Sequence, residues 1–137
     1  MKDIIETLQE SGRFGTILSL LHKTELTETL KGAGPFTFFA PDDDAFQRVQ
    51  LDSITADPDY LLSLLHYHIV PDKCPACEIA QKLELGTMSG KSLTIQLEEG
   101  EQEVDNARYV MTDIECSNGV IHIIDNVFLP QFSGWYD

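Results

Sequence analysis

Basic residues are scarce in this 137-residue chain. Nine Lys and Arg residues stand against 23 Asp and Glu residues, which gives a formal net charge of −14. Nucleic acids and anionic membrane surfaces are held by clusters of Lys and Arg. The composition therefore argues against both as partners. Simple solubility is the general reading of such acidity, and a basic protein partner or cation association is the alternative.

Long apolar runs are also missing. No run reaches the roughly 18 residues that a transmembrane helix needs. The start, Met1-Lys-Asp-Ile-Ile-Glu6, has no basic region followed by an apolar core, so no signal peptide is expected in this sequence. No Asn-x-Ser/Thr glycosylation acceptor occurs either. The three cysteines are an odd count, which a purely disulfide-based framework does not explain.

Catalytic motifs are absent as well. The serines form no Gly-x-Ser-x-Gly elbow, and the sequence has no phosphate-binding loop or dinucleotide fingerprint. Carboxylates are plentiful, but they lie at turns and helix starts, so no glycosidase pair can be identified. We expect a protein that is not an enzyme and that needs no cofactor.

Hydrophobic residues make up 42% of the chain and aromatic residues 9%, which is typical of a globular domain. Apolar positions recur at helical spacing through the first 83 residues, with a period of two after them. The predicted helices are Lys2–Glu10, Phe14–Lys23, Glu25–Lys31, Asp42–Val49, Asp59–His66 and Cys74–Leu83. The predicted strands are Phe36–Ala40, Tyr67–Val70, Leu85–Met88, Leu93–Leu97, Gln102–Asp105, Tyr109–Cys116 and Val120–Leu129. The pattern predicts one α+β domain over residues 1–137, with a β meander in its C-terminal half.

The centre of the predicted fold is the stretch Asn118-Gly-Val-Ile-His-Ile-Ile-Asp-Asn-Val-Phe-Leu-Pro130. Asn118-Gly119 predicts a two-residue hairpin turn with positive φ at both residues. The apolar run that follows predicts a central strand that is covered on both faces. Gly34-Pro-Phe-Thr-Phe-Phe-Ala-Pro-Asp-Asp-Asp-Ala-Phe46 has the same character, a short apolar strand and then a helix start.

These two stretches resemble the signature boxes of the fasciclin-like domain family. Leu64-Leu-His-Tyr-His-Ile-Val-Pro71, between them, resembles the family's Tyr-His segment. The resemblance covers about Phe14 to Pro130 and leaves an aromatic tail at 131–137. It implies a wedge of two β-sheets flanked by helices. It also implies a monomeric, non-catalytic adhesion or protein-interaction module, extracellular or at the cell surface, with a protein or cell-surface partner.

The resemblance also points to partner-binding residues. A Tyr-His pair implicated in receptor binding in some animal members falls on Tyr67 and His68, and an Asp-Ile pair falls on Asp113 and Ile114. The adhesive motif has Glu-Pro before the Asp, whereas this chain has Met111-Thr112. Tyr67, His68 and Ile114 lie in apolar runs, so a place in the core is the alternative for them.

Cys74-Pro-Ala-Cys77, at a predicted helix start, is the constellation with reactive potential. That context lowers a thiol pKa and favours thiol–disulfide exchange, although the expected fold lacks the βαβ units of thioredoxins. The structural alternatives are an ordinary disulfide, a pair of small buried thiols or a capped helix start. His66 and His68 precede the pair, and two His with two Cys are a possible zinc set whose spacing matches no common finger. Cys116 is expected to be a half-buried free thiol.

Asp42-Asp-Asp44 forms the densest group of carboxylates in the sequence. No alternating Asp-x-Asp-x-Asp loop with a distal Glu follows it, which excludes an EF-hand. Acidic residues are stabilised at helix starts by free amide groups and by the helix dipole. The group therefore predicts a helix start rather than a calcium site.

Overall fold

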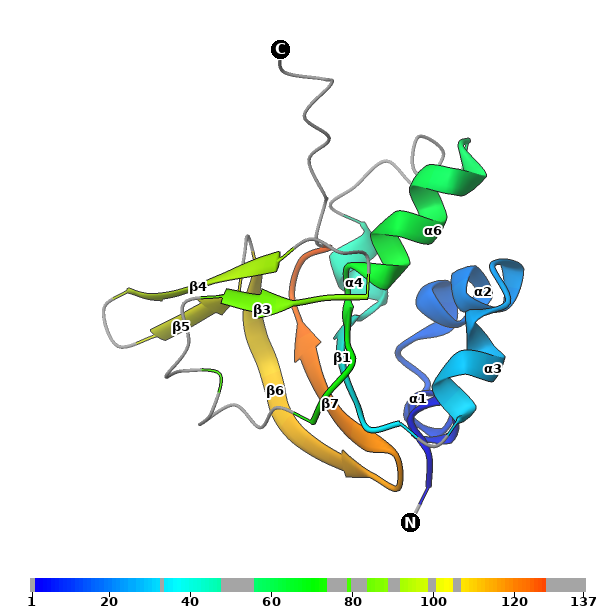
Figure 1. The fold of residues 1–137 in the computed structure, drawn as a ribbon, viewed down its shortest axis with the longest axis horizontal. Helices are drawn as coiled ribbons and strands as arrows, with labels where there is room; N and C mark the ends of the chain where they lie inside the picture. Colours follow the sequence, from blue (N-terminus) through cyan, green and yellow to red (C-terminus); the bar gives the residue numbers. More distant parts are fainter. Residues whose placement is uncertain are drawn as a thin grey trace.

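The computed structural model describes residues 2–32, 34–47, 56–73, 79, 84–88, 92–98, 101–104 and 107–127. Helices dominate the first half and strands the second (Figure 1). The helices are α1 (Ile4–Ser11), α2 (Gly15–Lys23), α3 (Leu26–Lys31), α4 (Asp43–Phe46) and α6 (Pro58–His66). The strands are β1 (Phe36–Pro41), β2 (Ile69–Val70), β3 (Glu84–Gly86), β4 (Ser92–Glu98), β5 (Glu101–Val104), β6 (Ala107–Cys116) and β7 (Gly119–Ile124). The predicted α+β class is confirmed, and none of these helices is long and apolar enough to cross a bilayer.

The strands pair in the order β2-β1-β7-β6-β5-β4-β3. From β3 to β7 each strand is antiparallel to the next, which is the predicted meander. Strand β1 runs parallel to β7 over six residue pairs, from Phe36 opposite Gly119 to Pro41 opposite Ile124. Both strands have a neighbour on each side, so the prediction that they are central is confirmed.

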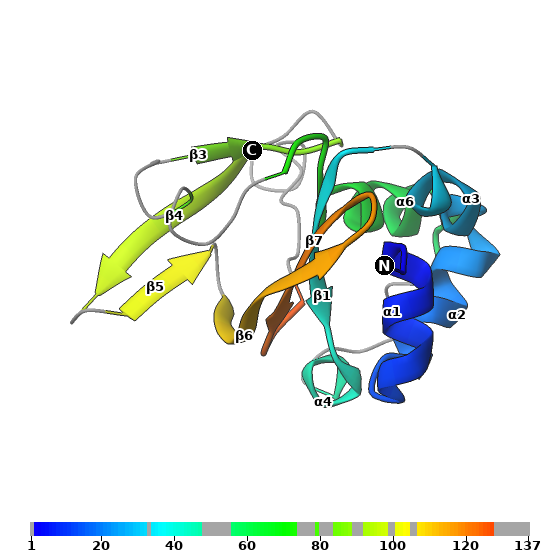
Figure 2. The ribbon, with the colours of Figure 1, turned by 90° about the horizontal axis from the view of Figure 1, so that it is seen from below.

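The sheet divides into two arms. Within the described residues, β5 and β6 are joined by two residue pairs, Glu103 with Arg108 and Val104 with Ala107. Beyond this short junction, β3, β4 and β5 diverge from the arm that holds β1, β7 and β6 (Figure 2). This is the wedge that the resemblance implies.

Each face of the central arm has its own core, because apolar side chains alternate along β1 and β7. Helices α1, α2, α3 and α6 cover one face (Figure 2). The core on that side includes Ile4, Leu8, Phe14, Ile17, Leu21, Leu30, Phe38, Leu61, Leu64, Leu65, Ile121 and Ile123. A second core fills the wedge between the arms and consists of Phe39, Tyr67, Val70, Ile79, Leu85, Leu93, Ile95, Val104, Ala107 and Ile124.

Asn118 ties the helical layer to the sheet. Its side-chain oxygen accepts a hydrogen bond from the backbone N–H of Ile4 at 3.1 Å, near the start of α1. Its Nδ2 donates to the carbonyl oxygens of Leu30 (2.6 Å) and Gly32 (2.9 Å), at the end of α3. Its own carbonyl oxygen accepts from the N–H of Phe36 at 2.9 Å. One nearly buried amide thus satisfies backbone groups at two helix ends, which have no intrahelical partners.

The predicted positive φ at Asn118 and Gly119 is wrong. Among the described residues positive φ occurs at Gly12, Glu25, Gly34 and Asp113, and the hairpin loop is Ser117-Asn118. Gly119 is needed for a different reason. A Cβ there would overlap the carbonyl oxygen of Phe36 and lie 2.8 Å from its carbonyl carbon and 2.9 Å from its nitrogen. The glycine therefore permits the close approach of β1 to β7.

Candidate functional site

Two consecutive apolar side chains are exposed on β6. Val110 is 48% exposed and Met111 is 51% exposed, and they are the exposed large hydrophobic residues in the described part of the chain. In a regular strand one of two successive side chains would point to the covered face. The pairing of β6 with β7 shifts register between Tyr109 and Met111, and such a bulge re-aims side chains. The irregular pairing thus explains why the apolar side chains of Val110 and Met111 are both exposed on β6.

A second register shift, between Met111 and Ile114, contains Asp113. Asp113 is exposed and has φ 58°, in the left-handed region that non-glycine residues seldom occupy. Its backbone N–H donates to Nδ1 of His122 on β7 at 3.1 Å. Residues held in such conformations cluster at binding and switch sites. We take the exposed residues Val110, Met111 and Asp113 as the candidate site, and refer to them as the β6 surface.

His122 supports this surface from inside the sheet. Its ring is fully buried, and its centroid lies 5.5 Å from that of Phe39 and 5.5 Å from that of Tyr109. Because Nδ1 accepts the Asp113 N–H, the proton of the neutral ring is on Nε2. His122 is therefore a buried, hydrogen-bonded histidine, and its bond to the Asp113 N–H helps to fix the Asp113 backbone.

The two pairs named by the resemblance differ in accessibility. Asp113 is exposed and Ile114 is half-buried against the helix-side core. Tyr67 is buried, and its hydroxyl donates to the carbonyl oxygen of Ser92 at 3.3 Å. His68 is fully buried, and its Nδ1 donates to the carbonyl oxygen of Leu64 at 2.8 Å. A partner can reach Asp113 directly, whereas the Tyr67 and His68 rings are enclosed.

The two pairs are nevertheless connected through the sheet. The carbonyl oxygen of His68 accepts a hydrogen bond from the N–H of Phe39 at 2.9 Å. The Phe39 ring lies against His122, which accepts from Asp113. The Tyr67-His68 segment therefore lies beside β1, and β1 and β7 separate it from β6 within the sheet.

The burial of His68 makes stability depend on pH. Burial lowers the pKa of His68 from 6.5 to about 4, and its hydrogen bond to Leu64 offsets only part of that shift. Between these two values the unfolded chain binds a proton that the folded chain excludes, so stability falls as pH drops below 6.5. We expect His68 to contribute a loss of about 2 kcal/mol in unfolding free energy between pH 6.5 and about pH 5.

Denaturant unfolding of the wild type and of His68→Asn over that range measures this contribution. The Asn amide can donate to Leu64 in place of Nδ1 but does not titrate. The wild type should lose about 2 kcal/mol more than the variant. Parallel pH profiles would show that His68 does not account for the acid sensitivity, since other titrating groups are common to both proteins.

The thiol and zinc hypotheses involve residues that are mostly outside the described ranges. Cys74 and Cys77 lie there, so both hypotheses remain predictions. His66, at the end of α6, is half-buried, and burial lowers its pKa. Within the described residues no group of three or more His, Cys, Asp or Glu side chains could hold a metal ion.

Cys116 is more enclosed than the sequence predicts. Its thiol is free and its side chain is buried, with Sγ 3.5 Å from Oγ1 of Thr7 and 3.6 Å from the carbonyl oxygen of Ile114. Burial raises its pKa, which disfavours the reactive thiolate. The residue belongs to the core between helices and sheet.

The acidic group at 42–44 has a structural role, as predicted. Asp42 accepts hydrogen bonds from the N–H of Ala45 (2.9 Å) and from Nη2 of Arg13 (3.1 Å), which caps α4 and pairs the charge. Asp43 accepts from the N–H of Thr16 at 2.9 Å, in the first turn of α2. These carboxylates join two helix starts.

The β6 surface was only partly predictable. Tyr109-Val110-Met111 places three apolar residues in succession on a strand that otherwise alternates, which is a signal for a bulge. The left-handed conformation of Asp113 has a weaker signal, because Asp only tolerates that region. The resemblance named Asp113 as a partner-binding candidate without fixing whether it is exposed, and the exposure of Val110 and Met111 was missed.

Comparison with known proteins gives a consistent result. The fasciclin domain model matches residues 12–130. Two proteins from Synechocystis sp., sll1483 and sll1735, are each 35% identical to this chain over 132 residues. The alignments cover 93% of this chain and 73% of sll1483, and 94% of this chain and 98% of sll1735. Human periostin is 29% identical over 138 residues, which are 94% of this chain but 16% of periostin.

A solved structure has the same fold. It is a FAS1 domain pair from the insect cell adhesion molecule Fasciclin I, and it superposes with a TM-score of 0.78 at 19% sequence identity. The match covers 94% of this chain and 51% of that chain. At this identity the likeness extends to the fold, including the helices followed by the wedge of strands.

Proposed function

The chain belongs to the fasciclin domain family, and on that premise we propose that it is a non-catalytic module that binds another protein through the β6 surface. Members of this family include cell adhesion proteins, among them the insect molecule whose domain pair has the same fold. The observation that carries the proposal is the geometry of β6. Two apolar side chains and a carboxylate are exposed within residues 110–113 of one strand, next to the buried rings of His122 and Phe39.

The β6 surface suits recognition in its chemistry. Interface centres are rich in apolar and aromatic residues, and Met in particular adapts to a partner's shape. Met111 is paired with Ile123 of β7, and the Asp113 N–H is bonded to the His122 ring, so little ordering entropy is lost when a partner docks. Exposed apolar groups that are held rigidly gain more from burial than mobile ones do.

Charge supports a basic partner. The net charge of −14 attracts positively charged proteins over distances comparable to the Debye length. Asp113 and Glu115 provide local acidity on β6, although Glu115 is already bridged to Lys73 at 3.1 Å. We propose that association slows as salt rises, because steering by charge is screened.

An attachment assay tests the proposal. Beads coated with the purified chain are mixed with cells of the species that encodes it, and attached beads are counted. The double variant Val110→Ser, Met111→Ser should reduce attachment by roughly tenfold, the effect of losing an interface anchor worth about 1–2 kcal/mol. Its stability should change by less than about 0.5 kcal/mol, because both side chains are half exposed.

The matched control is Glu28→Ser, at an exposed position of α3 away from β6. This variant should attach like the wild type. Equal loss of attachment in both variants would locate binding elsewhere, and no attachment by the wild type would exclude a surface adhesion role in those cells.

Thiol–disulfide exchange is the rival hypothesis, and it rests on Cys74-Pro-Ala-Cys77 in the sequence. Insulin reduction by the purified chain distinguishes the two. A rate clearly above that of free dithiol, lost in Cys74→Ser, would replace the binding proposal with an exchange activity.

A further inference from the structure

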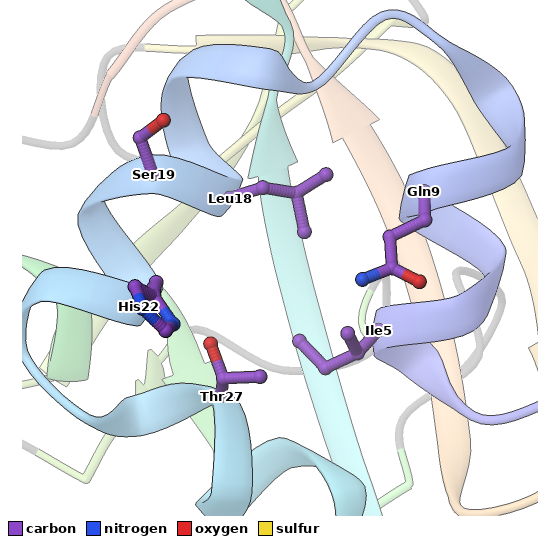
Figure 3. A pocket seen from close by; sticks show the side chains of 6 residues that line it. All are labelled: Ile5, Gln9, Leu18, Ser19, His22 and Thr27. Atoms are coloured by element: carbon purple, nitrogen blue, oxygen red, sulfur yellow. The ribbon is translucent and has the colours of Figure 1, made fainter.

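Helices α1, α2 and α3 border an open pocket of about 320 Å³ on the side of the molecule away from the wedge (Figures 2 and 3). It is lined by Ile5 and Gln9 of α1, Leu18, Ser19 and His22 of α2, and Thr27 of α3. Figure 3 shows the side chains of Ile5, Gln9 and Leu18 pointing into the space between the helices. The His22 ring and the Thr27 hydroxyl lie close together at one side of it.

The lining combines an apolar wall with neutral polar groups. Ile5 is fully buried and Leu18 is half-buried, so the wall is fixed by the core behind it. The Gln9 amide, the Ser19 and Thr27 hydroxyls and the His22 ring offer hydrogen-bonding groups to a ligand. None of the six lining residues is Asp, Glu, Lys or Arg, in a chain of net charge −14.

We infer that this pocket binds a neutral polyhydroxylated ring the size of one sugar unit. Hydroxyl groups, like the polar groups of the lining, both donate and accept hydrogen bonds. The C–H face of such a ring would pack on the half-buried Leu18, behind which the buried Ile5 lies. An anion would be repelled by the net charge, and a cation would find no carboxylate among these lining residues to pair with.

The size of the pocket sets the scale of the ligand. A volume of 320 Å³ is at the lower end of the roughly 300–1,000 Å³ range of small-molecule pockets. It accommodates a single ring rather than a folded partner or a long peptide. A neutral ring of about a dozen non-hydrogen atoms, in a pocket whose rim residues Gln9, Ser19 and His22 are exposed, should bind with a Kd of order 1 mM.

The test is an NMR titration of the ¹⁵N-labelled full chain with methyl α-glucopyranoside and methyl β-galactopyranoside. At least one should shift the backbone amides of the lining residues, with saturation at millimolar concentration. Glucuronate and glucosamine, which carry opposite charges on a similar ring, should bind at least several-fold more weakly. Absence of shifts with both glycosides, or equal shifts with the charged sugars, would overturn the inference.

Variants locate the binding. Thr27→Val removes one hydroxyl without changing side-chain shape, and Gln9→Leu removes the amide from an exposed position. Each should raise the Kd at least fivefold. Thr29→Val, on the same helix but not lining the pocket, is the matched control and should leave the Kd unchanged. If all three variants bind like the wild type, the sugar is not held at this pocket.

The same titration can distinguish a free sugar from the terminal sugar unit of a glycan. Maltose ends in the glucose ring, and lactose in the galactose ring, of the two methyl glycosides. If the disaccharide binds as well as its methyl glycoside, the pocket accepts the terminal unit of a glycan; if it binds much more weakly, the pocket takes the free sugar. Protein binding at β6 is independent of either result, because none of the pocket residues lies on that strand.

Discussion

Gly119→Ala is expected to destabilise the fold by about 4 kcal/mol or more, at the severe end of single substitutions. The added methyl would overlap the carbonyl oxygen of Phe36, and its other close neighbours are also backbone atoms of Phe36. Backbone in the β1–β7 ladder cannot move aside as a flexible side chain can. The first residue pair of the parallel ladder must therefore separate, and the melting temperature should drop by roughly 10–15 °C.

The control is Gly86→Ala on β3. A Cβ at Gly86 meets nothing within 4 Å, so the change should be close to neutral. Urea unfolding of the two variants gives the comparison directly. Similar stabilities of the Gly119→Ala and Gly86→Ala variants would show that β1 and β7 approach each other less closely than in this structure.

Asn118→Ala is expected to cost about 3 kcal/mol. The substitution removes three hydrogen bonds and leaves the N–H of Ile4 and the carbonyl oxygens of Leu30 and Gly32 without their side-chain partner. Water can reach part of this site, since Gly32 is exposed, so the penalty stays below the sum of three fully buried losses. The measurement is again denaturant unfolding, with Ser117→Ala, an exposed residue in the same turn, as a control.

Asn118→Asp distinguishes hydrogen bonding from packing. The two side chains have the same shape, but a carboxylate would face the carbonyl oxygens of Leu30 and Gly32 that the amide now bonds. We expect Asp to be at least as destabilising as Ala at neutral pH. If Asn118→Asp is as stable as the wild type, the site needs only the volume of the side chain.

The sequence predicts most of the secondary structure because apolar patterning dominates it. The runs at 36–40 and 120–129 indicate covered strands, and β1 and β7 are indeed central. Parallel pairing between them is not encoded locally, since about 80 residues separate the partners along the chain. The Asn118-Gly119 pair was identified correctly as important but for the wrong property, because close backbone approach is a tertiary feature.

The candidate site shows the same division. Tyr67 and His68 are in an apolar run, and their burial follows from that pattern. Val110 and Met111 are also apolar, yet they are exposed. Two register shifts interrupt the alternation of side-chain direction along β6. Local sequence gives the polarity of a residue, whereas the bulges decide which side chains face the solvent.

The most direct test of a binding role for the β6 surface is site-specific photo-crosslinking. Benzoyl-phenylalanine replaces Met111 in one sample and Glu28 on α3 in another, and each protein is irradiated with cells of the encoding species. The account predicts a discrete crosslinked protein from position 111 that weakens as salt approaches about 1 M, and none from position 28. A crosslink from position 28 alone, or none from 111 while wild-type beads attach, would contradict it.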